Sequence, residues 1–353
     1  MSTSTVRGAS IALLLAMAAM PKPALACATC GCSLSSDAAT GYSADTGWHL
    51  SLQYDFIDQN QLRIGTRSVS AAQVAAINDA GGAQEIEQAT INRYTTLGVG
   101  YTPNPDWNMR LLISYIDRGH STYGQATNPL TRDQISGSTI KGLGDIRFIV
   151  SYQGLLEDKN LGLQVGIKAP TGRYGGPSAD GTAIVGRSPT AFDSGPISQR
   201  PSPGNLVDTS LQPGTGSTDV ILGAYYHQFV TDNLNAFVNG QFQSAVSHRL
   251  NQPGQDFRPG NTTTVSFGVR YEAHPDIVPQ VQVNIFHKSP DQGALADNPD
   301  SAGTVVYLSP GVTVALAGNL QAFGFVQVPV YRNLNGYQLA PKWTASAGLS
   351  YAL

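Results

Sequence analysis

The feature that most constrains the fold of this chain is the alternation of apolar and polar residues with a period of two. Between residues 47 and 58, for example, Trp48, Leu50, Leu52 and Tyr54 alternate with polar side chains. Successive side chains of a β-strand point to opposite faces, so the pattern predicts strands with one apolar and one polar face. Twelve such segments are predicted, at residues 47–58, 93–102, 107–117, 144–153, 161–169, 217–229, 234–244, 262–272, 278–287, 303–316, 320–332 and 343–353.

The connections between these segments alternate strictly between long and short. The short ones cover residues 103–106, 154–160, 230–233, 273–277 and 317–319. The long ones cover residues 59–92, 118–143, 170–216, 245–261, 288–302 and 333–342. Outer-membrane barrels have even numbers of antiparallel strands, short periplasmic turns and longer outer loops, and closure removes the unpaired edges that a bilayer excludes. The sequence therefore predicts an all-β fold, a transmembrane antiparallel up-and-down β-barrel of about 12 strands with both termini in the periplasm.

The composition agrees with a wall that faces lipid. Charged residues make up 13% of the chain, with 38 Gly and 15 Tyr, whereas a soluble domain has about 25% charged residues. A soluble array of β-sandwiches is the alternative. The net charge of −3, without any basic cluster, indicates no nucleic-acid partner.

The first 26 residues have the pattern of a secretory signal peptide. Arg7 precedes an apolar run at residues 11–20, and Ala24-Leu25-Ala26 has the small-x-small form of a cleavage site. The run is shorter than the roughly 20 residues needed to span a bilayer, and no other apolar segment approaches that length. We expect a signal peptide at 1–26, a periplasmic tether at 27–46 and an outer-membrane barrel at 47–353, in the outer membrane of a Gram-negative bacterium.

The only three cysteines of the chain, Cys27, Cys30 and Cys32, lie together at the start of the predicted mature protein. Thiolates at this spacing bind soft ions such as Cu(I) or Zn, and a tetrahedral zinc site would need a fourth ligand from elsewhere. Two alternatives stay open, a disulfide within the leader and a lipid on Cys27. All three predictions place the cysteines in the oxidising periplasm.

Charged residues recur on the polar face of the predicted strands. Rings of charged side chains set the selectivity of some pores, whereas a lattice of salt bridges would only rigidify the wall. Eight strands fill with side chains and 16–18 leave a water channel, so a barrel of about 12 lies between these cases. The residues predicted to line the lumen are Asp55, Arg110, Asp145, Arg147, Lys168, Arg270 and Glu272.

Two long connections have distinct compositions. Residues 70–79 are predicted to form a short helix, and residues 170–216 are rich in Gly, Pro, Ser and Thr. Either connection is compatible with folding inward to narrow the opening, or with extending outward as a surface loop.

His287 and Ser289 suggest a minor alternative, an outer-membrane lipid hydrolase. The two residues share one face of a predicted strand, and a nucleophilic Ser needs an adjacent base with an orienting partner. No such partner is evident on neighbouring strands, and Pro290 follows at once. The other histidines are scattered without the spacing of metal ligands. The prediction is that the chain is not an enzyme.

Four motifs lie at the ends of predicted strands: Gly142-Leu143-Gly144-Asp145, Lys168-Ala169-Pro170-Thr171-Gly172, the segment 212–219 (QPGTGSTD) and Gly336-Tyr337-Gln338-Leu339. Together they resemble the outer-membrane transporter family named for the phenol meta-degradation pathway, over residues 47–353. The resemblance implies a porin-like β-barrel that passes small, hydrophobic or aromatic solutes and has no catalytic residue. The Cys-x-x-Cys-x-Cys leader belongs to a subset of this family.

We therefore expect a porin-like channel or transporter for a small solute or ion. In the alternative, the barrel anchors the thiol leader, which binds a soft metal or exchanges electrons with a periplasmic partner. The expected partners are outer-membrane lipid, a small solute or metal ion, and the barrel-insertion machinery, which would read the alternating last strand at Leu349-Ser-Tyr351-Ala-Leu353.

Overall fold

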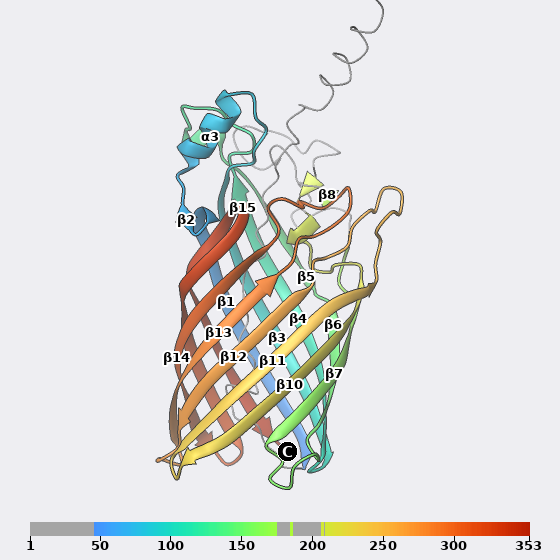
Figure 1. The fold of residues 1–353 in the computed structure, drawn as a ribbon, viewed down its shortest axis with the longest axis vertical. Coiled ribbons are helices and arrows are strands. Elements are labelled where there is room, and N and C mark those ends of the chain that lie inside the picture. The colour runs from blue at the N-terminus through green and yellow to red at the C-terminus, as the bar shows by residue number, and fades with distance from the viewer. Residues whose placement is uncertain (1–45, 175–183, 186–205, 208) are drawn as a thin grey trace, which may run out of the picture.

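The computed structural model describes residues 46–174, 184–185, 206–207 and 209–353, and these form a β-barrel with a loop region at one end (Figure 1). The barrel strands are β1 Gly47–Gly65, β3 Glu87–Asn104, β4 Trp107–Thr122, β6 Ile146–Tyr152, β7 Leu161–Ala169, β10 Thr218–Thr231, β11 Leu234–Ser247, β12 Thr262–Tyr271, β13 Ile277–Lys288, β14 Gly303–Ala317 and β15 Leu320–Ala352.

Within the described residues, these eleven strand elements form a closed antiparallel ring. Each pairs with its neighbour along the chain, and β15 pairs with β1 from His49↔Ala352 onwards. Two further strands, β2 Arg67–Ser68 and β5 Ser136–Leu143, extend the same sheet beside β1 and β4. β8 Ile184–Val185 and β9 Leu206–Val207 pair only with each other. The predicted all-β, antiparallel, closed fold is confirmed.

The last element, β15, contains both of the final predicted segments. Residues 320–334 pair with β14, and residues 334–352 pair with β1. A Cβ atom added to Gly348 would lie 2.4 Å from the Phe323 ring, so the two halves lie beside each other. Gly336, at φ 59°, lies at the turn between them. The strand number therefore depends on whether β15 counts once or twice, and twelve stays a prediction.

Several strands extend beyond their predicted ends. β1 continues to Gly65, β3 already begins at Glu87 and β4 continues to Thr122, all inside segments predicted to be loops. These extensions project beyond the barrel at the loop end (Figure 1). Residues such as Asn60 and Gln61 interrupt the apolar alternation there. The predicted boundaries were wrong because strand pairing continues where the two-faced pattern stops.

The barrel wall is apolar outside and polar inside. On β7, Val165 and Ile167 are 60% and 46% exposed, whereas Gln164 and Lys168 on the alternate positions are 5% and 3% exposed. Trp48, Leu50 and Leu52 on β1 follow the same rule outward, with Gln53 and Asp55 buried inside. The period-two alternation therefore separates an outer apolar surface from a polar lumen.

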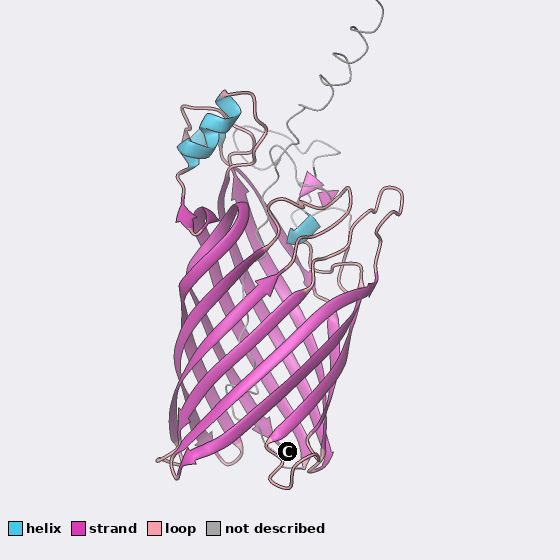
Figure 2. Cartoon of the chain, in the orientation of Figure 1, coloured by secondary structure: helices cyan, strands magenta, loops and turns pink. Residues whose placement is uncertain are grey.

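The helix α3 Ala71–Asp79 lies beyond the rim of the barrel (Figure 2). A capping box begins it: the Ser70 hydroxyl accepts from the Gln73 backbone N–H at 3.2 Å, and the Gln73 side chain accepts from the Ser70 N–H at 2.8 Å. Val74 and Ala75 pack against Leu62 and residues 86 and 339. The short helix is confirmed, and it lies on the rim rather than in the lumen.

No helix among the described residues is long and apolar enough to cross a bilayer. Both ends of the described barrel lie opposite α3, because the Leu353 N–H donates to the Trp48 carbonyl at 2.8 Å and Gly47 pairs with Thr102. The predicted tether, residues 27–46, lies outside the described residues apart from Thr46.

Gly336 offers a test of the turn in β15. Replacing it with Ala is expected to lower the free energy of unfolding, because a left-handed backbone costs an L-residue about 1–2 kcal/mol. The added Cβ would also lie 1.4 Å from Asp300 Oδ1, which accepts from the Tyr337 N–H at 3.0 Å. Gly324→Ala is the matched control, because a Cβ there has no neighbour within 4 Å. Urea unfolding of the refolded barrel in vesicles measures the stability of both variants. Equal unfolding midpoints for Gly336→Ala and Gly324→Ala would contradict the tight turn.

Candidate functional site

A cavity of about 430 Å³ lies inside the barrel. Its wall begins at Asn108, the second residue of β4, at the end of the barrel where the chain terminates. It continues to Pro213 and Asp291 in the connections at the opposite end. The cavity therefore follows the barrel axis over most of its length, along the inner faces of β4, β6 and β7.

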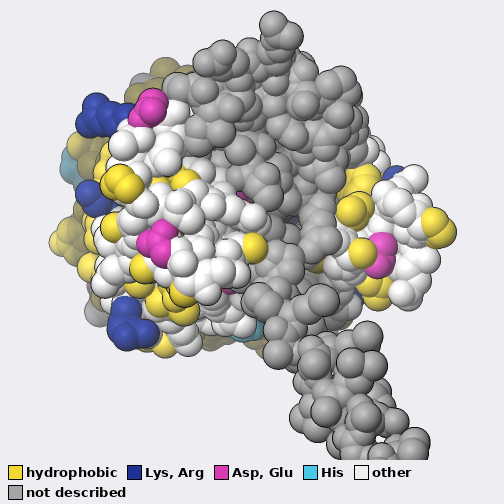
Figure 3. All heavy atoms as spheres, turned by 90° about the horizontal axis from the view of Figure 1, so that it is seen from above, with side chains coloured by type: hydrophobic (Ala, Val, Ile, Leu, Met, Phe, Trp, Pro, Cys, Tyr) yellow, Lys and Arg dark blue, Asp and Glu magenta, His cyan; other side chains and the backbone are white. Residues whose placement is uncertain are grey.

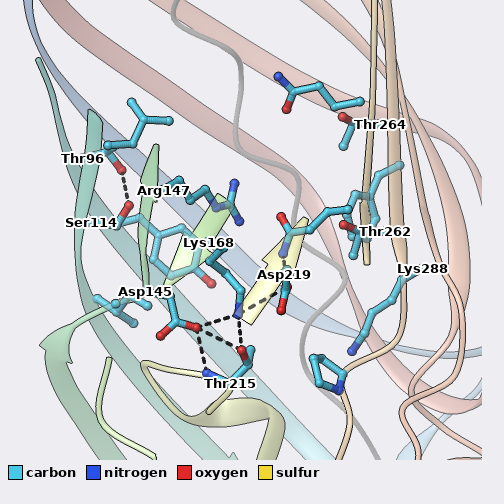
Figure 4. Close-up of a pocket in the computed structure, with 18 of the residues that line it drawn as sticks. Thr96, Ser114, Asp145, Arg147, Lys168, Thr215, Asp219, Thr262, Thr264 and Lys288 are labelled. Atoms are coloured by element: carbon cyan, nitrogen blue, oxygen red, sulfur yellow. Dashed lines mark hydrogen bonds and ion pairs between the residues drawn. The ribbon is translucent and has the colours of Figure 1, made fainter. Parts of the chain in front are cut away.

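Uncharged polar side chains line much of the cavity and bond to one another between strands. The Gln164 Nε2 atom donates to Ser151 Oγ at 3.2 Å, and Gln241 Nε2 donates to Gln164 Oε1 at 2.9 Å. The Thr96 and Ser114 hydroxyls lie 3.0 Å apart, as Figure 4 shows. Amides and hydroxyls provide both donors and acceptors, so the wall suits a hydrated or polar solute.

The centre of the site is a buried charge cluster around Lys168. Its ammonium donates to Asp145 Oδ2 at 2.8 Å and lies 3.3 Å from Asp219 Oδ2 (Figure 4). It also donates to the hydroxyls of Thr215 and Ser217. Lys168 and both carboxylates are at most 5% exposed. A buried ammonium is tolerated when opposite charges and hydrogen bonds satisfy its donors, and this one is fully satisfied.

The same cluster holds a segment of chain inside the barrel mouth, residues 209–217, which we call the inner loop. Asp145 Oδ2 accepts from both the backbone N–H and the hydroxyl of Thr215 at 3.0 Å. Its other oxygen accepts from the Gly172 N–H at 3.0 Å. A Cβ on Gly172 would lie 2.7 Å from the Gly214 Cα, so the two backbones meet where only glycine fits.

A second anchor holds the beginning of the inner loop. The Arg118 Nη1 atom donates to the Ser210 carbonyl at 2.9 Å, and its Nη2 donates to the Tyr94 hydroxyl at 2.7 Å. The Thr209 hydroxyl donates to the Leu295 carbonyl at 2.6 Å. The inner loop lines the cavity and narrows its loop end. Of the two alternatives predicted for residues 170–216, residues 209–216 therefore show inward folding, whereas β8 lies beyond the barrel rim (Figure 1).

The predicted lumen residues occupy two regions. Five of them lie on the cavity wall: Asp55, Arg110, Asp145, Arg147 and Lys168. Asp55 accepts from Gln53 Nε2 at 2.9 Å and from Ser346 Oγ at 2.5 Å, a link between β1 and β15.

Arg270 and Glu272 lie elsewhere. The Arg270 Nε atom donates to Glu272 Oε1 at 2.9 Å, at the end of β12 that is distant from the inner loop. Neither residue lines the cavity. The structure therefore does not bring this pair together with the other five predicted residues.

Sequence reasoning missed four charged residues that line the cavity: Arg118, Asp219, Lys288 and Asp291. Asp219 is in register with Lys168 on β7, a pairing that the sequence does not reveal. Arg118 lies just beyond the predicted strand end at residue 117. Lys288 donates to Asp291 Oδ2 at 2.9 Å within a segment predicted to be a loop. For Asp219 alone, the sequence offered a clue: it lies at a position of its predicted strand whose side chain points inward.

At the end of the barrel distant from the inner loop, aromatic side chains point into the lumen. A Cβ on Gly311 would lie 2.2 Å from the Phe325 ring, and one on Gly162 would lie 2.1 Å from the Tyr225 ring. Each ring therefore packs against a glycine of a neighbouring strand. Inward aromatic residues fit into the lumen there because the glycine beside them has no side chain.

His287 and Ser289, the residues of the hydrolase alternative, bond to different neighbours in the described chain. His287 Nδ1 lies 2.9 Å from Thr304 Oγ1 on the outer face, and Ser289 Oγ accepts from the Asn261 N–H at 2.8 Å. Each side chain is thus engaged by a different neighbour. A nucleophile and base need a direct hydrogen bond, and this pair does not supply one.

The predicted metal ligands Cys27, Cys30 and Cys32 lie outside the described residues. Among the described residues, no group of three His, Asp or Glu could hold a metal ion. The surface around α3 carries mainly uncharged side chains with a few isolated Lys, Arg, Asp and Glu, as Figure 3 shows.

No protein-family model matches the chain, and no curated protein matches it in sequence. Among solved structures, an outer membrane channel from Pseudomonas putida F1 is similar, with a TM-score of 0.60 and 12% identity over 91% of this chain and 100% of that one. A FadL homologue of Pseudomonas aeruginosa and the toluene transporter TbuX of Ralstonia pickettii each give a TM-score of 0.42 at 10% identity. They cover 87% and 88% of this chain and 90% of each of theirs. The first similarity shows a shared barrel fold.

Replacing Asp145 with Ala tests the anchor of the inner loop. The Thr215 and Gly172 amides lose their acceptor, so their hydrogen exchange is expected to accelerate about tenfold or more, since a hydrogen bond to a charged group contributes about 1.5–3 kcal/mol. Asp117→Ala is the control, because Asp117 pairs with the exposed Lys141 at 3.0 Å outside the cavity. Unchanged exchange at residues 172 and 215 would show that the inner loop is held by other contacts.

Proposed function

We propose that this protein is an outer-membrane channel that lets small solutes cross through the barrel lumen. The observation that carries the proposal is a cavity along the barrel axis, lined by polar side chains and enclosed by an apolar outer surface. A polar interior within an apolar belt is the arrangement of barrels that span a bilayer. The fold shared with the Pseudomonas putida channel supports the same role.

The orientation follows from the connections. The turns at the end that carries Gly47 and Leu353 are short, whereas α3, the inner loop and the strand extensions lie at the other end. Because outer-membrane barrels have short periplasmic turns, we place the termini in the periplasm and α3 outside. The outer side chains then contact lipid, and membership in the family named for the phenol meta-degradation pathway remains part of this proposal.

The dimensions favour small solutes over large ones. A volume of about 430 Å³ falls within the range of about 300–1,000 Å³ in which proteins bind single small molecules. The inner loop narrows one end, held by Asp145 and Arg118. A solute must therefore pass close to the charged wall, where the wall can select it.

Conductance in planar bilayers tests the channel. The wild-type barrel is expected to carry ionic current, and Ser114→Trp to reduce it several-fold, because Ser114 lines the cavity and a Trp ring would occupy it. Tyr115→Trp is the matched control on the next residue of the same strand, whose side chain is 44% exposed on the outer face. A barrel without current, or equal effects of both substitutions, would contradict passage through this cavity.

The cysteine leader keeps its separate prediction as a soft-metal site or redox tether. Protein purified without reductant is expected to carry Cu or Zn that is lost in Cys30→Ser, because thiolates hold these ions. Elemental analysis with intact mass measures metal, lipid and disulfide together. A mass two hydrogens lower without metal would favour the disulfide, and an acyl increment on Cys27 would favour the lipid.

A further inference from the structure

Two arginines and two aliphatic residues form a patch on the cavity wall, which we call the arginine patch: Arg110, Leu112, Arg147 and Ile149. The register of β4 and β6 places Arg110 opposite Ile149 and Leu112 opposite Arg147. Residues two apart on a strand share a face, so all four point into the lumen. The arginines occupy one diagonal, within reach of long side chains at about 7–8 Å, and the aliphatic residues occupy the other.

Arg147 is the member of the arginine patch that interacts with the wall only at longer range, through the charges of Asp219 and Asp145. Its side chain is exposed to the cavity, and it forms no hydrogen bond or ion pair with the described residues. Figure 4 draws Arg147 near Lys168 without a dashed line to any residue shown. Lys168, directly opposite Arg147 in the register of β6 and β7, is instead bound by two carboxylates.

The charge of the cavity wall also favours an anion. Among the described residues, five cationic side chains and four carboxylates line the cavity: Arg110, Arg118, Arg147, Lys168 and Lys288 against Asp55, Asp145, Asp219 and Asp291. A cleft with low-dielectric walls concentrates ions of opposite sign. A guanidinium presents a planar fork that matches a carboxylate. Leu112 and Ile149 would oppose a fully hydrated ion and favour an apolar group beside it.

We propose that the arginine patch binds the carboxylate of a small organic monoanion, whose apolar body lies on Leu112 and Ile149. The proposal rests on the channel function and specifies its solute class. A dianion such as phosphate matches the patch less well, because the net excess is one charge and half of the patch is aliphatic.

Benzoate and its neutral isostere benzamide are suitable probes. Titration calorimetry on the full chain in detergent is expected to show benzoate binding, with benzamide at least about tenfold weaker. Arg147→Gln is expected to weaken benzoate by a similar factor, and Arg147→Lys less, because the charge remains without the fork. Lys141→Gln is the matched control, since this outward cation is 47% exposed and outside the cavity. In bilayers, benzoate should interrupt the current of wild type and not that of Arg147→Gln.

The outcomes separate this proposal from the channel itself. Equal affinity for benzoate and benzamide, or benzoate binding unchanged in Arg147→Gln, overturns the carboxylate site while any current leaves the channel intact. Chloride or phosphate competing as well as benzoate shows a simple anion site and overturns the apolar part, which Leu112→Ser tests directly. Benzoate binding without current supports the site and contradicts the channel. Loss of heat-modifiable migration on gels identifies a variant that does not fold. If Arg147→Gln does not fold, the benzoate affinity of Arg147→Lys tests the carboxylate site instead.

Discussion

The pairing of β1 with β15 is the constraint on which the remaining structure depends. It joins the two ends of the chain, from His49↔Ala352 to Gly65↔Leu334, so that the ring has no open edge. In lipid, an unpaired backbone group would cost several kcal/mol, a cost that strands avoid only in a closed barrel. The register also fixes the faces, because a slip of one residue would exchange the lipid side and the lumen side of every strand. The Ser346 hydroxyl donates to Asp55 inside the seam in this register.

Closure creates an interior in which charges must be satisfied by other side chains. The cluster of Lys168, Asp145 and Asp219 shows how this is done, with nearly complete burial and every donor of the ammonium bound. The cluster is structural, because it ties β7 and β10 to the inner loop. Arg147 lies directly opposite Lys168 and interacts with Asp145 and Asp219 only through their charges. A rigid lattice therefore describes the Lys168 cluster, and the selective wall that we propose would depend on the neighbouring Arg147.

The two ends of the lumen use different chemistry. Near the inner loop the wall is charged and amide-rich, whereas at the other end aromatic rings such as Phe325 and Tyr225 lie against glycines of adjacent strands. A ring that packs against a glycine occupies space that a side chain on the neighbouring strand would otherwise fill. The outer surface is therefore consistently apolar, whereas the inner surface is not consistently polar. Apolar side chains occur in the lumen where the neighbouring strand carries a glycine.

The sequence by itself determined the fold class, because a bilayer accepts strands only in a closed barrel and the period of two is a local property of the chain. The alternation also determined which residues of each strand face inward, and these include Asp55, Arg110, Asp145, Arg147 and Lys168. Only the tertiary structure decided which of these meet, since the Lys168–Asp219 contact depends on a register between strands almost fifty residues apart. It also decided that the inner loop enters the lumen, because contacts with Asp145 and Arg118 hold it there and composition alone allowed either direction.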